Sequence, residues 1–268
     1  MVRTVKKSTQ IPVLGHADGL CTLYLRADYA PSLATRVIVD AKTSYPAACN
    51  ALETLLVDEA ALSTVLPAVA EALLAKGVSL RCDAPSKAAL SSALDQHLAV
   101  ILQDATEEDY RTEFLDLKLA IKTIPTQSTP EAAADLAIAH INEYSSHHTD
   151  AILTEDKGIA ARFQGAVDSA GVFWNTSTRM ADGQRFGFGT EVGISTNKIH
   201  ARGPVGLEGL TIYRWLISGQ GQISTEYGAG GKKWKHEKLP VGEQERYAAT
   251  DEELEALRRF RAGRGGGS

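Results

Sequence analysis

The chain has 268 residues, of which 44% are hydrophobic, and it carries a formal net charge of −5 with a sequence pI of about 5.8. This length is enough for one large core or two modest ones. The acidic balance argues against a nucleic-acid partner, and no stretch approaches the roughly 20 apolar residues of a membrane helix, so neither partner is expected.

Strand-like and helix-like segments alternate along most of the chain. Strands are expected as two short pieces within residues 11–30 and then at 54–58, 78–83, 99–104, 113–124, 150–156, 170–177 and 211–218. Helices are expected at residues 32–43, 59–77, 86–98, 129–145 and 158–167. This alternation predicts an α/β domain with a largely parallel sheet.

Two of the helices carry clear end signals. The periodic segment 59–77 ends at Gly77, a typical residue just beyond a helix C-terminus. In the segment that begins at Thr129, the threonine can cap the helix, Pro130 suits the first helical position and Glu131 suits the first turn.

The character of the sequence changes from Thr176. Residues 176–210 are rich in Gly, Arg and Thr and lack periodicity, and a structured loop of this length is more often functional than idle. Beyond Gly228 the sequence is polar and charged, so we expect residues 228–268 to be mostly disordered, with one possible helix at 251–261.

Cys49 lies in the segment PAACNALETLL, which has the composition of a helix start. A helix N-terminus would favour the thiolate and lower the pKa of the thiol from its usual value near 8.5. The alternative is a small buried core residue, which is the expected role of Cys21 and Cys82 in their apolar strand patterns. Three scattered cysteines without a CxxC pair or a secretion signal predict reduced thiols in a cytoplasmic protein.

No histidine follows Cys49 at local spacing. A Cys–His pair therefore requires a tertiary contact with His16, His140 or His200. His147 and His148 lie in a turn before a strand, with no further ligand at metal-binding spacing, so no metal site is expected there.

Gly187, Gly189 and Gly193 do not have the spacing of a dinucleotide-binding fingerprint, and the favoured interpretation is a tight loop that needs positive φ or close backbone approach. Arginines and hydroxyl residues in the same region could bind a carboxylate or phosphate, or could be solvated loop residues: Arg179, Arg185, Arg202, Ser177, Thr178, Ser195 and Thr196. Glu113 stands alone before an apolar strand and by itself is more typical of a surface acid.

Taken together, several long segments are familiar: IPVLGHADGLC, DAKTSYPAACNALETLLV, TEFLDLKLAIKTI, HTDAILTED, STRMADGQRFGFGTEVGIST and KIHARGPVGLEGLTIYRW. From about Ile11 to Gly221 the chain resembles the gamma-glutamyl phosphate reductase family, also called glutamate-5-semialdehyde dehydrogenase, of the aldehyde dehydrogenase superfamily. The resemblance implies an aldehyde dehydrogenase-like catalytic domain.

The resemblance also implies a reaction and its residues. The family reduces L-glutamyl 5-phosphate to L-glutamate 5-semialdehyde with NADPH in proline biosynthesis, and Cys49 matches its thioester-forming nucleophile. Glu113 and Phe114 match the place of a Glu-Phe pair near the nicotinamide ribose. The loop Ser177–Thr196 matches the segment that lines the substrate tunnel in related enzymes. We infer that Arg179 or Arg185, with Ser177 and Thr178, holds the substrate carboxylate.

The family's chains are much longer, and the resemblance begins near the end of their nucleotide-binding domain. We therefore expect a remnant of that domain at 1–40, the catalytic domain at 41–200, a C-terminal interface strand region at 201–227 and the tail at 228–268. A homo-oligomer and a glutamate 5-kinase partner are implied. The alternatives are an inactive fragment that serves only folding, oligomerisation or binding, and a cysteine-dependent hydrolase.

Overall fold

The structure, a computed structural model, describes residues 1–189, 191–216 and 220–233. The chain divides into two compact units, Met1–Tyr213 and Arg214–Ser268. The possible helix at 251–261 and most of the expected disordered tail lie outside the described residues. The predicted boundary between residues 40 and 41 falls within a helix and stays a prediction.

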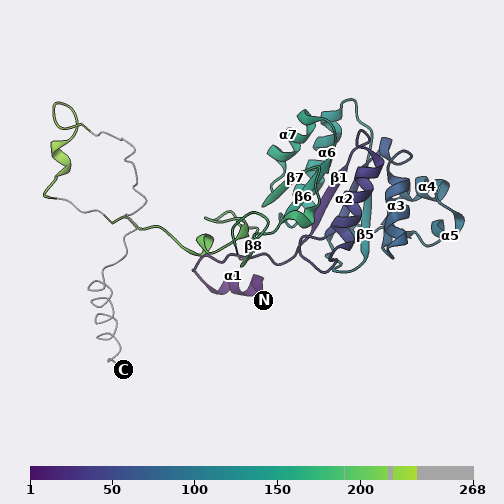
Figure 1. Cartoon of the computed structure of the whole chain (residues 1–268), viewed down its shortest axis with the longest axis horizontal. Coiled ribbons are helices and arrows are strands. Elements are labelled where there is room, and N and C mark those ends of the chain that lie inside the picture. The colour runs from purple at the N-terminus through teal and green to yellow at the C-terminus, as the bar shows by residue number, and fades with distance from the viewer. Residues whose placement is uncertain (190, 217–219, 234–268) are drawn as a thin grey trace, which may run out of the picture. The chain divides into compact units, whose positions relative to one another are not determined.

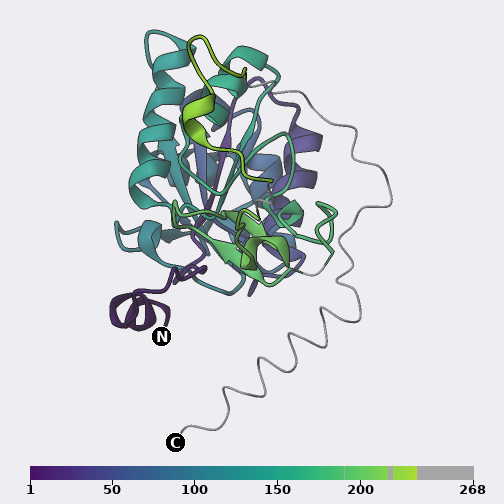
Figure 2. The ribbon, with the colours of Figure 1, turned by 90° about the vertical axis from the view of Figure 1, so that its left-hand side faces the viewer.

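The first unit is built on a seven-stranded sheet, shown in Figure 1 and, from the side, in Figure 2. Its order is β4-β3-β5-β2-β1-β6-β7, and every neighbouring pair is parallel. The strands are β1 Cys21–Leu25, β2 Leu52–Asp58, β3 Ser79–Cys82, β4 Gln103–Asp104, β5 Lys118–Ile124, β6 Thr149–Leu153 and β7 Gly171–Trp174. The predicted α/β class with a parallel sheet is confirmed. A separate antiparallel pair joins β8 Gly193–Ser195 and β9 Gly203–Val205.

Helices cover both faces of the sheet, with α2 and α3 on one face and α6 and α7 on the other (Figure 1). The α-helices are α1 Val2–Ser8, α2 Pro31–Thr43, α3 Leu66–Ala75, α4 Ala84–Ala93, α5 Gln96–Ala99, α6 Pro130–Tyr144 and α7 Lys157–Ala166. Short 3-10 turns are η1 Glu59–Ala61, η2 Asp109–Arg111, η3 Thr178–Met180, η4 Glu208–Leu210 and η5 Ser224–Glu226. None of the described helices combines the length and the apolar character needed to cross a membrane.

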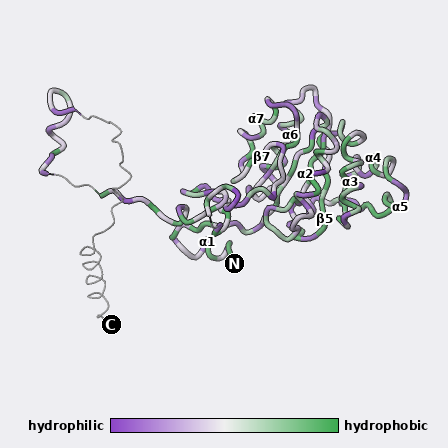
Figure 3. Tube along the Cα trace, viewed as in Figure 1, coloured by the Kyte–Doolittle hydropathy of each residue, from purple (hydrophilic) through white to green (hydrophobic). Residues whose placement is uncertain are grey.

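The central strand β1 is buried on both faces, as expected of a parallel sheet between two helical layers. Leu23 and Leu25 belong to the core beneath α2 and α3, whereas Tyr24 belongs to the core beneath α6 and α7. The ring of Tyr24 stacks on Phe163 of α7 with centroids 6.5 Å apart. Figure 3 shows hydrophobic residues along much of α3 and β5, in keeping with their buried faces.

The helix end signals are confirmed at two places. Thr129 Oγ1 accepts a hydrogen bond from Ala132 N at 3.2 Å, with Pro130 at the start of α6. Gly77 follows α3 with φ of +79°, a conformation that only glycine adopts without strain. The single helix predicted for 59–77 is wrong at its start, because Pro67 suits a first turn and α3 begins at Leu66.

Other sequence predictions are corrected by the structure. Residues 11–20 form no strand; this segment instead lies along the loop of β8, where Asn197 Nδ2 donates to Val13 O at 2.9 Å. The strand expected at 113–124 begins only at Lys118, and the one at 99–104 shrinks to β4. Residues 211–216 also form no strand, and residues 217–218 of that prediction lie outside the described part.

Candidate active site

The loops that precede β1, β2, β5 and β6 meet at one edge of the sheet. Parallel strands all begin at the same edge, so Gly19, Cys49, Glu113 and His148 come close together although they are far apart in the sequence. Because these residues precede their strands, the candidate site is at the amino edge of the sheet. This is opposite to the carboxyl edge, where ligands of open parallel sheets usually bind.

Cys49 does not lie at a helix start, and that prediction is wrong. It occupies a turn between α2 and β2, in which Ala51 N donates to Ala48 O at 2.9 Å. The alanine-rich composition resembles a helix start, but the apolar run after it pairs on both sides as β2, between β1 and β5.

The pKa of Cys49 is raised, not lowered as predicted. Partial burial is the largest cause, and the negative charges of Glu191 and Glu113 add to it. The backbone N–H of Cys49 and the guanidinium of Arg179 act in the opposite direction. The residue is only half-buried, so the thiol is not sealed in the core.

The other two cysteines are core residues, as predicted. Cys21 is fully buried and Cys82 is 1% exposed. The Cys21 thiol lies directly behind the nucleophile candidate and donates to Cys49 O at 3.3 Å. Burial raises the pKa of both thiols.

Gly19 packs against the backbone of Cys49. A Cβ atom on Gly19 would stand 2.7 Å from Cys49 Cα and would overlap its carbonyl group, so a larger residue does not fit. Gly19 N also donates to Glu113 Oε1 at 2.9 Å. No pattern in the sequence indicated this contact.

Arg179 is tied to the turn that carries Cys49. Its Nη1 donates to Asn50 Oδ1 and its Nε donates to Ser44 Oγ at 3.2 Å. Asn50 in turn donates from Nδ2 to Ala181 O at 2.7 Å. These bonds hold the segment after β7 against the turn that carries Cys49.

The remaining predicted substrate residues lie further along the same segment. Ser177 caps η3 by accepting from Arg179 N at 3.3 Å. Thr178 is fully buried, and its Oγ1 has no hydrogen-bond partner in the part of the chain that the structure describes. Arg185 is exposed and donates from Nη1 to Arg179 O. Their contact with a substrate stays a prediction.

Arg202 and the loop glycines have structural partners. Arg202 Nη1 donates to Asp168 Oδ1 at 3.0 Å, which explains this arginine as an ion pair. Gly187 and Gly189 have φ of +82° and +76°, so the predicted tight loop is confirmed.

Glu113 and Phe114 lie in the loop before β5. The Glu113 carboxylate is held by Gly19, and its charge acts on Cys49. The Arg81 guanidinium lies over the Phe114 ring at 5.3 Å.

A buried ion pair supports this loop. Lys42 Nζ lies 2.7 Å from Glu53 Oε2, and both side chains are essentially inaccessible to solvent. Glu53 Oε1 accepts from Leu115 N at 3.2 Å. Burial raises the pKa of Glu53 and lowers that of Lys42, while each charge opposes the shift of the other.

Of the three histidines considered as partners of Cys49, only His16 lies beside it. His16, Cys49 and His148 each offer a potential ligand atom, and these atoms lie within 4.8 Å of one another. His140 instead stacks on Tyr144, and His200 contacts Gly209 O at 2.9 Å.

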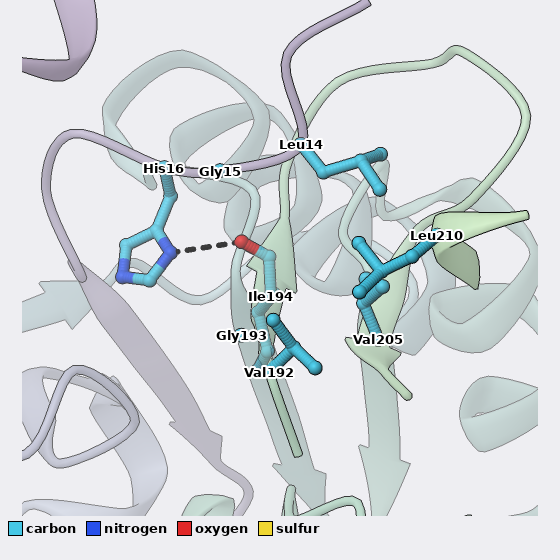
Figure 4. Close-up of a pocket in the computed structure, with 8 residues that line it drawn as sticks. All are labelled: Leu14, Gly15, His16, Val192, Gly193, Ile194, Val205 and Leu210. Atoms are coloured by element: carbon cyan, nitrogen blue, oxygen red, sulfur yellow. Dashed lines mark hydrogen bonds between the residues drawn. The ribbon is translucent and has the colours of Figure 1, made fainter. Parts of the chain in front are cut away.

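His16 also borders a cavity of about 210 Å³, shown in Figure 4. The lining is mostly apolar: Leu14, Gly15, His16, Val192, Gly193, Ile194, Val205 and Leu210. An apolar lining does not suit the charged groups of an anionic substrate.

Comparisons with known proteins find relatives in the family that the sequence resembles. No family model matches the chain. A gamma-glutamyl phosphate reductase of Synechococcus elongatus is 54% identical over 236 residues, which are 88% of this chain and 51% of the relative. A probable gamma-glutamyl phosphate reductase of Schizosaccharomyces pombe is 48% identical over 241 residues, 90% of this chain and 51% of the relative. The chain spans about half the length of these curated relatives.

Several solved structures share the fold of this chain. A crystal structure of gamma-glutamyl phosphate reductase from Thermotoga maritima matches with a TM-score of 0.73 and 38% identity over 83% of this chain and 50% of that one. A probable aldehyde dehydrogenase of Listeria monocytogenes shares the fold, with a TM-score of 0.61 and 16% identity over 84% of this chain and 55% of that one. An engineered glycolyl-CoA reductase, solved with NADP+ bound, shares the fold at a TM-score of 0.51 and 14% identity, over 76% of this chain and 51% of that one.

Proposed function

Because the chain is homologous to about half the length of the gamma-glutamyl phosphate reductases, we propose that it carries the nucleophile of such an enzyme. The reaction is reduction of L-glutamyl 5-phosphate to L-glutamate 5-semialdehyde with NADPH, in proline biosynthesis. The observation that carries the proposal is the half-buried Cys49, which lies at the amino edge of the sheet between Arg179 and Glu113.

Cys49 performs the first step by attacking the acyl carbon. A carbon–sulfur bond forms, the carbon–oxygen bond to phosphate breaks, and phosphate leaves with the electron pair. Charge that develops on the carbonyl oxygen is met in part by the backbone N–H of Cys49. Arg179 supports this step because its positive charge favours the thiolate.

The thioester is then reduced. NADPH, when bound, supplies a hydride to the acyl carbon. The carbon–sulfur bond breaks as the aldehyde forms, and Cys49 regains its thiolate. Glu113 fits a role at the ribose, because Gly19 holds one oxygen of its carboxylate and the other accepts no hydrogen bond among the described residues.

The substrate carboxylate is assigned to the segment after β7. Arg179 is the stronger candidate because it already lies beside Cys49, while Arg185 is exposed further out. Ser177 and the buried hydroxyl of Thr178 border the same segment.

Acyl transfer tests the first step without relying on hydride transfer. The purified chain is mixed with glutamyl phosphate that a glutamate kinase generates in situ, and intact mass is measured after acid quench. We expect one acyl group per chain, absent from Cys49→Ser and retained in Cys82→Ser. If the Cys49→Ser protein is acylated as well as the parent, the proposal is wrong.

A second candidate function is hydrolysis of the same acyl phosphate. It is favoured by His16, which lies in the cluster with Cys49 and could activate water. Adding NADPH to the acylated chain separates the two: a reductase releases aldehyde and oxidises NADPH, whereas a hydrolase releases glutamate at the same rate with or without NADPH.

Partners and location follow from the proposed reaction. Glutamyl phosphate is a labile acyl phosphate, so a glutamate 5-kinase is the partner that would supply it. Three free cysteines suit a reducing cytoplasm. A homo-oligomer is supported by the exposed apolar side chains after β9, among them Ile212 at 85% and Tyr213 at 100% exposure.

A further inference from the structure

Three side chains from distant parts of the sequence converge beside the sheet edge. His16 precedes β1, Cys49 precedes β2 and His148 precedes β6, and β1 lies between the other two strands. Each side chain offers one ligand atom, and the three atoms lie within 4.8 Å of one another. Two imidazoles and one thiol are the ligands that zinc and related soft cations prefer.

His16 is oriented as metal-binding histidines usually are. Its Nδ1 donates to Ile194 O at 3.0 Å, because a backbone carbonyl can only accept (Figure 4). The lone pair of the neutral ring is therefore on Nε2, which in Figure 4 points away from Ile194. A carbonyl that holds the far nitrogen is the usual support of a histidine ligand.

In His148, only one of the two ring nitrogens has hydrogen-bond partners among the described residues, and the Cys21 thiol is one of them at 3.8 Å. Its Nδ1 lies 3.0 Å from Thr149 Oγ1, which can accept the ring proton. Its Nε2 is buried without a hydrogen-bond partner among the described residues, and the residue is 0% exposed. A buried nitrogen without a partner is costly, and a bound cation would satisfy it.

The charges around Cys49 also suit a cation. Glu191 and Glu113 place two negative charges near Cys49, against the one positive charge of Arg179. The two negative charges attract a divalent cation, and a metal that binds sulfur displaces the thiol proton to solvent.

We propose that His16, Cys49 and His148 form a binding site for a thiophilic divalent cation of the Zn²⁺ class, and that an occupied site shields the Cys49 sulfur. Bond lengths of about 2.0 to 2.3 Å place the ligand atoms of a tetrahedral zinc site about 3.4 Å apart. The three atoms lie within 4.8 Å of one another, so each pair must approach by at most about 1.4 Å, which rotation of the half-buried His16 and Cys49 side chains would provide. Water takes the fourth position.

The site escapes sequence analysis because its ligands are 33 and 99 residues apart, with no motif spacing. The inference does not rest on the proposed reaction, since it concerns only cation binding and access to the sulfur.

Direct binding is the first test. The full chain is stripped with EDTA, desalted and titrated with Zn²⁺ against a chromogenic chelator, and with Co²⁺ while the near-ultraviolet spectrum is recorded. We expect one equivalent of either metal and a thiolate-to-cobalt charge-transfer band. Cys49→Ser should lose the band, and His16→Asn and His148→Asn should each weaken binding at least tenfold.

Matched controls are available in the neighbouring residues. His147→Asn keeps a residue that tolerates the φ of +62° found there, and Cys82→Ser alters a buried thiol elsewhere; both should bind as the parent does. Thermal melts confirm that each variant is folded. A band that survives Cys49→Ser, or histidine variants that bind like the parent, would overturn the proposal.

Protection of the thiol tests the same site in the unmodified protein. One equivalent of Zn²⁺ should slow alkylation of Cys49 by iodoacetamide at least tenfold, and EDTA should restore the original rate. Unchanged alkylation in the presence of Zn²⁺ would also overturn the proposal.

Discussion

Gly19 and Cys49 are in backbone contact, so that a Cβ on the glycine would lie 2.7 Å from Cys49 Cα. The position of the sulfur therefore depends on a residue 30 positions earlier in the sequence. Several properties of the candidate site can be tested from this contact and from the groups around it.

Gly19→Ala should displace the turn that carries Cys49. We expect acyl transfer to fall at least tenfold and the free energy of unfolding to fall by about 1 to 3 kcal/mol, as for other overpacked sites. Quenched-flow mass measurement and urea titration give the two values. Gly15→Ala is the control, because the nearest atom to its new methyl group would be Val2 Cγ1 at 3.8 Å. Equal effects of both substitutions would contradict the steric argument.

Iodoacetamide should label Cys49 well before Cys21 and Cys82 in buffer that contains EDTA, because only Cys49 is accessible. Since the pKa of Cys49 is raised, its labelling rate should keep rising with pH beyond the usual thiol value of about 8.5. Peptide mass spectrometry follows all three sites. Equal labelling, or a rate for Cys49 that levels off near neutral pH, would be inconsistent with this environment.

Lys42→Met should leave the Glu53 carboxylate buried without its cation. We expect a loss of about 3 kcal/mol in the free energy of unfolding at pH 8, the usual result when one partner of a buried pair is removed. Urea titration measures it. The double variant Lys42→Met/Glu53→Gln, which keeps an acceptor for Leu115 N, should recover most of the loss. A double variant no more stable than Lys42→Met would show that packing, not charge, is responsible.

His140→Phe should reduce the acid sensitivity of the fold. Burial lowers the pKa of His140 to about 4, so between pH 6.5 and 4 the unfolded chain binds a proton that the folded chain does not. Stability from this group is present above pH 6.5 and is lost as the pH falls, by about 2 kcal/mol between pH 7 and 5.

The phenylalanine ring can keep the stacking of His140 on Tyr144, whose ring centroid lies 4.3 Å away. Urea titrations of parent and variant at pH 7 and 5 give the difference. His97→Gln, at an exposed position, should behave as the parent does. An unchanged pH dependence in His140→Phe would refute the assignment.

The sequence predicted what local patterns control. Periodicity and caps placed α2 and α6, and the alternation of elements predicted the parallel sheet. The motif around Cys49 identified this residue as the candidate nucleophile. Its surroundings were not, because an alanine-rich segment is compatible with either a helix or a turn, and only pairing of β2 with β1 and β5 decides.

The neighbours of Cys49 arise from tertiary contacts. His148 showed no ligand spacing, and Glu191 belonged to a loop without periodicity. The need for glycine at position 19 depends on the backbone of Cys49, which approaches from the turn before β2. Patterns within one segment carry no information about such contacts.

The residues of the candidate site lie at the amino ends of the strands. The loops at the carboxyl ends lie on the opposite edge of the sheet. The exposed turn between β5 and α6, around Gln127 and Ser128, is one such connection. An affinity tag or fluorescent reporter spliced in there would be carried on the side of the sheet away from the reactive sulfur, and would allow the thiol to be studied on an immobilised protein.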